Sequence, residues 1–157
     1  MKIQIRYRTG LVDTAGNPAH AATFIRKHLI LLDETLRAQP TEHYRILTHE
    51  YFHFVWVRLG NPLRRSWEGV LQNEANRRAR GETGWSAEWR KRELTPSDIT
   101  KRSRRWREYC CESFCDTAAW LFAGLSRHPE FTLPSRNRRH RRQWFRSFLP
   151  STRPIPI

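Results

Sequence analysis

The chain has 157 residues, of which 38% are hydrophobic and 12% aromatic, and a formal net charge of +14. This is the length of one domain with a hydrophobic core, and seven Trp add apolar mass, so a disordered basic chain is excluded. Charged residues interrupt the N-terminal stretch where a signal peptide needs an apolar run, and no window is long enough to span a membrane. We therefore expect a cytoplasmic protein without a membrane partner.

Cysteine and arginine content give weaker indications. The odd number of cysteines, three, favours a reducing compartment over a disulfide framework. A strongly basic chain suits nucleic acid, an anionic surface or an acidic protein partner. Nearly all of the basic residues are arginine, however, and a G+C-rich coding sequence also produces that skew, so the charge alone does not identify a partner.

The N-terminal third predicts a small sheet. Residues 2–8 alternate apolar and polar side chains, as a half-buried strand does, and residues 10–18 have the composition of a loop or turn. Residues 24–33 end in an apolar run. We favour a strand over Lys27–Leu32, although residues 21–27 could equally begin a helix.

The middle of the chain predicts helices. The first begins at Pro40-Thr41, with Thr41 as N-cap, and ends at Gly60-Asn61-Pro62. A second runs from Trp67 to about Arg80. Residues 85–94 fit a short helix, a mobile cover over a cleft or an exposed loop.

The C-terminal third predicts two more helices. A long helix begins at Thr95-Pro96 and continues without interruption to Gly124, and from Tyr109 onward it is apolar around most of its circumference. Residues 135–149 predict a final amphipathic helix, and residues 151–157 a Pro-rich extended tail. We therefore expect an α+β fold in one domain over residues 1–157, with a small N-terminal sheet packed on a mainly helical body.

The helix that begins at Pro40 carries His49-Glu50-x-x-His53. Because four residues turn a helix by about 400°, the two imidazoles lie about 40° apart on one face, one turn above the other. Two such imidazoles can bind one Zn²⁺, and Glu50 beside them can take a proton from water on the metal. Apolar residues surround the motif, and burying these polar groups without a partner is unfavourable. The pattern therefore favours a zinc site over a solvent-exposed histidine pair.

A catalytic zinc site also needs a third protein ligand and an open position for water. The apolar half of the long helix offers Glu112 and Asp116, which are four residues apart and share one face. Glu112 could bind zinc while Asp116 accepts the N–H of a ligating histidine. Glu108, one turn before Glu112, is a rival ligand. Glu112 would then take the supporting position, and we favour Glu112 as ligand because an aspartate such as Asp116 suits that position. Cys111 and Cys115 are also four residues apart and could bind metal, but we expect them to pack as small apolar side chains in a helix interface.

This pair of motifs, His-Glu-x-x-His on an early helix and Glu112-x-x-x-Asp116 on a later one, resembles the gluzincin branch of zinc metallopeptidases. It resembles the small intracellular ImmA/IrrE-type members in particular, over roughly residues 24–124. It implies a zincin-like domain with Glu112 as third zinc ligand and Asp116 as the residue that supports a ligating histidine. It also implies that the strand Lys27–Leu32 is the sheet edge along which an extended peptide aligns.

The function predicted by these residues is peptide-bond hydrolysis by a zinc metallopeptidase acting on a peptide or protein substrate. Zinc would lower the pKa of its bound water toward about 7 and polarise the substrate carbonyl. Glu50 would act as general base, removing the proton of that water and delivering it to the leaving amine.

Two further residues are candidates for stabilising the oxyanion of this reaction. His128 follows the long helix, and Tyr109 lies on the Glu112 side of it. We expect the remaining histidines to be surface or structural residues, namely His20, His28, His43 and His140.

A second interpretation is a basic nucleic-acid-binding or regulatory module in which the zinc is structural. Its support is a cluster of arginines and one aromatic residue that could stack on bases, formed by Arg136, Arg138, Arg139, Arg141, Arg142 and Trp144. A solvated helix face explains the same cluster. An open metal site favours the enzyme, whereas a site closed by four protein ligands favours the module.

Overall fold

A computed structural model describes residues 2–13 and 16–149. They form a mainly helical α+β fold with a small N-terminal sheet, which confirms the predicted class. The strands and α-helices are, in chain order, β1 (Gln4–Arg8), β2 (Ala21–Phe24), β3 (Leu29–Asp33), α1 (Pro40–Arg58), α2 (Asn61–Asn76), α3 (Trp85–Arg92), α4 (Pro96–Lys101), α5 (Arg104–Phe122) and α6 (Ser135–Phe148). None of the helices described here is both long and apolar enough to cross a membrane. The predicted tail over residues 151–157 lies outside the described residues.

The chain divides into two compact units. The first consists of Met1–Leu59 and Phe114–His128, and the second of Gly60–Ser113 and Pro129–Ile157. Helix α5 contributes to both, because the division falls after Ser113. The single zincin-like domain over residues 1–157 stays a prediction.

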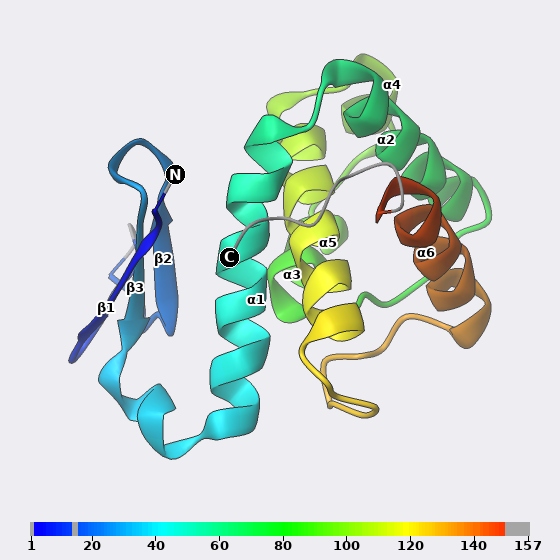
Figure 1. The fold of residues 1–157 in the computed structure, drawn as a ribbon. Helices are drawn as coiled ribbons and strands as arrows, with labels where there is room; N and C mark the ends of the chain where they lie inside the picture. The colour runs from blue at the N-terminus through cyan, green and yellow to red at the C-terminus, as the bar shows by residue number, and fades with distance from the viewer. Residues whose placement is uncertain (1, 14–15, 150–157) are drawn as a thin grey trace. The chain divides into compact units, whose positions relative to one another are not determined.

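The first unit is built around its sheet. β3 is the central strand, with β1 parallel to it on one side and β2 antiparallel on the other, and α1 runs alongside these strands (Figure 1). The core between sheet and helix is formed by buried apolar side chains, namely Ile30, Leu32, Leu36, Ile46 and Phe54. Burial of these side chains is the main force that holds α1 against the sheet.

The strands differ from the prediction at one edge. Residues 25–27 form a short 3₁₀ helix, so the strand predicted over Lys27–Leu32 is observed as Leu29–Asp33. It lies in the middle of the sheet, and the implied edge position is therefore wrong. The edge strands are β1 and β2. The sequence did not reveal β2, because two alanines give it little β-propensity and its pairing with β3 decides its conformation.

Helix α1 begins two residues earlier than the predicted N-cap Thr41 requires. Gln39 is the N-cap and Pro40 the first helical residue, so Thr41 lies inside the first turn and is not the cap. Proline is favourable there because the first N–H groups of a helix have no partner within the helix and the fixed φ of proline suits its first turn. The helix ends at Arg58, before Gly60, as predicted.

The second unit consists of helices. α2 begins at Asn61, earlier than the predicted Trp67, because Pro62 occupies its first turn. Residues 85–92 are helical, so the short-helix alternative for this segment is confirmed. α2 and α6 pack through the fully buried Trp67, whose ring centroid lies 5.6 Å from that of Phe145 in an edge-to-face arrangement.

The long helix predicted from Thr95 is two helices. Its start is confirmed by a capping box in which Thr95 and Asp98 bond each other's backbone N–H groups. The helix is interrupted at Arg102, which adopts a left-handed conformation with φ 48°. The Arg102 guanidinium donates two hydrogen bonds of 2.7 Å to Glu68 on α2. Ser103 donates to the Asp98 carboxylate over 2.7 Å. Helical periodicity cannot reveal this break, because the bond to Glu68 is a tertiary contact.

Candidate metal centre

α1 places His49 and His53 next to each other on one face. Their ring centroids are 5.0 Å apart and their planes meet at 75°. His49 is buried and His53 half-buried. The two rings are therefore adjacent, as the helical spacing predicted.

Asp116 on α5 contacts the first of these histidines. Its Oδ1 lies 2.7 Å from His49 Nδ1, and the carboxylate is almost completely buried. A protonated Nδ1 donates to this oxygen and leaves the lone pair of the ring on Nε2. This is the arrangement in which a carboxylate orients a metal-binding imidazole. Asp116 thus lies where its predicted supporting role requires, and the role itself stays a prediction.

Cys115, the residue before Asp116, completes a group of three donors. One donor atom each from His49, His53 and Cys115 lie within 4.8 Å of one another. The Cys115 side chain is fully buried. Imidazole nitrogen and thiolate sulfur are ligands that zinc takes in proteins. These three residues therefore form a group that could hold a metal ion, and the donor set fits zinc.

The carboxylate of Glu50 is held by the edge strand β2. Thr23 on β2 donates a 2.6 Å hydrogen bond from its Oγ1 to Glu50 Oε2. Thr23 Oγ1 also lies 3.2 Å from the Glu50 carbonyl oxygen. The Thr23 hydroxyl thus fixes the direction of the Glu50 carboxylate beside the histidine pair. No sequence motif singles out Thr23, because its contact with Glu50 depends on how β2 packs against α1.

Glu112, the predicted third ligand, belongs to the second unit. Its Oε1 lies 3.7 Å from Arg90 Nη2 on α3. The rival Glu108 is half exposed and pairs with Arg104 over 2.6 Å within the same helix, as surface residues do. The ligand role of Glu112 stays a prediction.

The two oxyanion candidates each contact a carboxylate, and their predicted role stays a prediction. Tyr109 is buried in the second unit and donates a 2.5 Å hydrogen bond to Glu82. Its pKa is raised well above 10, first by burial and then by the neighbouring Glu82 charge. His128 Nε2 lies 2.7 Å from Glu42. Glu42 precedes His49 by about two helical turns, which is about 10 Å along α1.

The second unit contains a buried ionic cluster around Arg141. This arginine is fully buried and contacts Glu74 Oε2 and Glu82 Oε2, each over 2.6 Å. Lys91 adds a 3.1 Å contact to Glu82. Burial alone would raise the pKa of Glu82, but the charges of Arg141 and Lys91 and the hydrogen bonds outweigh it and lower the pKa from 4.5 to about 2. The sequence placed these residues in a loop and two different helices, and no local signal joined them.

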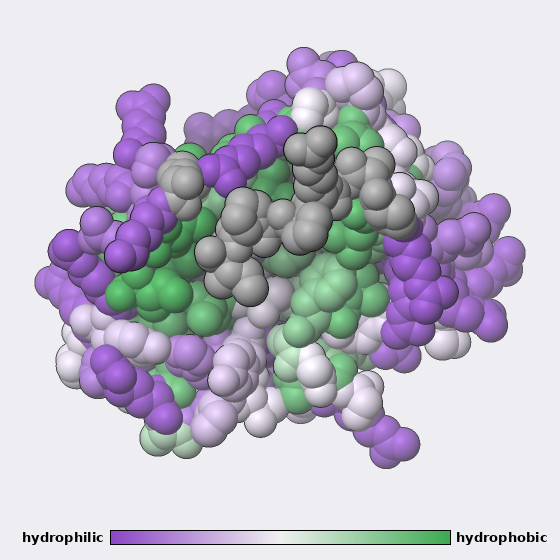
Figure 2. Space-filling view, viewed as in Figure 1, coloured by the Kyte–Doolittle hydropathy of each residue, from purple (hydrophilic) through white to green (hydrophobic). Residues whose placement is uncertain are grey.

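This cluster corrects part of the predicted nucleic-acid surface. Arg141 cannot contact a phosphate, because its guanidinium is buried between two carboxylates. Trp144 packs on Trp67 with a centroid distance of 5.0 Å and donates to Ser66, so its ring belongs to the packing of α2 and α6. Three of the other arginines are exposed, namely Arg136, Arg139 and Arg142, and Arg138 is half-buried. Hydrophilic residues gather over α6 in Figure 2.

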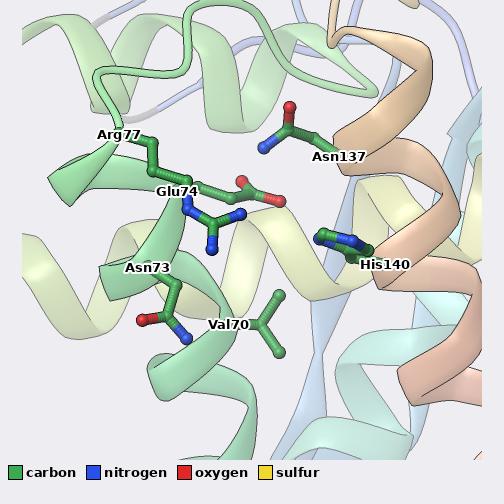
Figure 3. Close-up of a pocket in the computed structure, with 6 residues that line it drawn as sticks. All are labelled: Val70, Asn73, Glu74, Arg77, Asn137 and His140. Carbon is green, nitrogen blue, oxygen red and sulfur yellow. The ribbon is translucent and has the colours of Figure 1, made fainter.

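A polar recess of about 280 Å³ lies between α2 and α6. Figure 3 shows the six residues that line it, Val70, Asn73 and Glu74 from α2, Arg77 at the C-cap of α2, and Asn137 and His140 from α6. His140 is exposed at this recess, whereas His43 in the first unit lies 2.7 Å from the Tyr7 hydroxyl. Neither histidine belongs to the metal-ligand group, which agrees with the surface or structural roles expected for them.

Comparison of the chain with protein-family models, with curated proteins and with solved structures returned no match.

Proposed function

We propose that this protein is a zinc-dependent metallopeptidase. The observation that carries the proposal is the group of His49, His53 and Cys115 donors with the Asp116 carboxylate at His49 Nδ1. Two imidazoles on one helical face, one of them oriented by a buried carboxylate, are typical of a metal site with a catalytic function. The sequence resemblance to gluzincin metallopeptidases indicates the same reaction.

The residues around the histidines have distinct tasks in this proposal. When bound, zinc supplies Lewis acidity that lowers the pKa of a water molecule toward about 7. Glu50 is the general base, and its Oε1 takes the proton because Oε2 accepts the hydrogen bond from Thr23. Asp116 keeps the His49 ring in the tautomer whose Nε2 lone pair can bind the metal.

The outer edge of β2 supports an extended peptide as substrate. Asp33 N–H donates to the His20 carbonyl over 2.8 Å, so the even-numbered positions of β2 are those bonded to β3. The main-chain groups of Ala21 and Thr23 therefore point away from β3. A peptide strand paired there would bond to Thr23, whose side chain also holds Glu50. β2 thus takes the role that the resemblance gave to residues 27–32.

The test is hydrolysis of fluorescein-labelled casein by the zinc-loaded full chain, together with elemental analysis. Glu50→Gln should keep the zinc and lower the rate at least about 100-fold, because it removes the base but no ligand. Glu34→Gln is the matched control, since Glu34 lies outside the site and forms an exposed pair with Arg37. Full hydrolysis by the Glu50→Gln variant would overturn the proposal.

A nucleic-acid-binding module is the second candidate. It is favoured by the exposed Arg136, Arg139 and Arg142 on α6 and by the net charge of +14. Changing these three arginines to glutamine should weaken binding to duplex DNA and reduce its salt dependence, because each phosphate contact contributes to that dependence. Binding of equal strength and equal salt dependence would exclude this face as the contact.

A further inference from the structure

We infer that Cys115 is a ligand of the metal, so that the third protein donor is a thiolate and not the Glu112 carboxylate. This inference rests on the metal site of the proposed function, but it does not depend on peptidase activity. The sequence favoured an apolar packing role for Cys115. Its place in the structure gives it a chemical role as well.

The backbone around Cys115 is fixed against α1 on both sides. The Phe114 ring lies 5.8 Å from that of Phe52 and 5.2 Å from that of Trp56, between centroids. On the other side, Asp116 is bonded to His49 over 2.7 Å. Cys115 lies between these contacts and is fully buried, so it has little freedom to turn away from the histidine pair.

The donor distances match the reach of one ion. Zinc binds nitrogen at about 2.0–2.1 Å and sulfur at about 2.3 Å in a tetrahedral arrangement, which sets its donor atoms about 3.3–3.6 Å apart. The donors of His49, His53 and Cys115 all lie within 4.8 Å of one another. Side-chain rotations that move each donor atom by about 1 Å or less bring all three into bonding distance of one ion.

Thiolate ligation has chemical consequences. On binding, the Cys115 thiol loses its proton to solvent and the sulfur donates an electron pair to the metal. Two imidazoles and one thiolate leave a fourth position open, as a catalytic site requires. A sulfur donor also favours zinc and cobalt over magnesium and manganese, which prefer oxygen ligands.

Cobalt(II) substitution tests the inference without reference to activity. The Co²⁺-loaded full chain should show the near-ultraviolet charge-transfer band of a thiolate bound to cobalt. Cys115→Ala should remove this band and lower zinc affinity by more than the roughly 10–100-fold that follows loss of a supporting residue. Cys111→Ser, one turn earlier on α5, and Glu112→Gln should both keep the band.

If Cys115→Ala does not fold, the spectra of the wild type and of Cys111→Ser still test the inference, because the band should be present in both. Cobalt binding without the band, or a band that survives Cys115→Ala and is lost in Cys111→Ser, would overturn the inference. Casein hydrolysis separates the two proposals. Hydrolysis without a thiolate band leaves the peptidase and removes Cys115 as ligand, whereas the band without hydrolysis keeps the ligand and removes the peptidase.

Discussion

The molecule contains two buried polar clusters of opposite character. In the second unit, the carboxylates of Glu74 and Glu82 are matched by the cations of Arg141 and Lys91, all supplied by the chain. In the first unit, the group of His49, His53 and Cys115 consists of electron-pair donors. Buried charges matched by side chains serve the fold, whereas converging donors suit a metal cation. Burial of polar groups therefore does not by itself indicate a functional site. The kind of partner that the buried groups require indicates it.

The largest expected effect is on the ionic cluster. Arg141→Met leaves two carboxylates buried without their main cation, and we expect the free energy of unfolding to fall by about 3–5 kcal/mol. Urea denaturation followed by circular dichroism measures this change. Arg142→Met, an exposed neighbour, should alter the free energy of unfolding by no more than about 0.5 kcal/mol. Equal stability of the two variants would show that the cluster is not structural.

The pH dependence of stability follows from Glu82. Its pKa in the folded protein is about 2, below the ordinary 4.5, so the unfolded chain binds its proton more tightly. The stabilisation is fully present above pH 4.5 and is lost as the pH falls from 4.5 toward 2. Denaturation curves at a series of acid pH values should show this loss, and Arg141→Met should make it smaller. A wild-type stability that is flat over this interval contradicts the assignment.

A smaller effect is expected at the metal-ligand group. Asp116→Asn removes the charge that orients His49, and zinc affinity should fall about 10–100-fold with the fold retained. Competition with a fluorescent chelator measures the affinity. Asp98→Asn weakens a helix cap and the contact with Ser103, both in the second unit, and should leave zinc affinity unchanged. If Asp116→Asn instead lowers the stability of the fold and leaves zinc affinity unchanged, Asp116 serves the fold, as the ionic cluster does, and not the metal.

The smallest effect is expected at Thr23. Thr23→Val removes the hydrogen bond to Glu50. Because this bond is only partly buried, we take the lower end of the about 1.5–3 kcal/mol that a bond to a charged group contributes, and kcat for casein should fall about tenfold. Zinc content should not change. Thr23→Ser keeps the hydroxyl and should restore most of the rate, which a purely structural role for the β-branched side chain would not predict.

Local pattern was sufficient for part of the fold. The alternation in residues 2–8 identified β1, and Thr95 with Asp98 identified the start of α4. The same reasoning missed β2 and the break at Arg102, because both depend on partners distant in the sequence, β3 and Glu68. Periodicity reports which residues share a face of one element and says nothing of what that face meets.

The candidate site divides in the same way. The sequence by itself determined that His49 and His53 share a face with Glu50 beside them, because helical spacing fixes neighbours within one helix. Only the tertiary structure decided that Cys115 joins the histidines, that Thr23 holds Glu50 and that Arg141 is buried. Each of these results from packing between segments far apart in the chain. A difference of a few ångströms there decides whether a thiol fills a core or faces a metal, and residue spacing within one helix cannot predict such a distance.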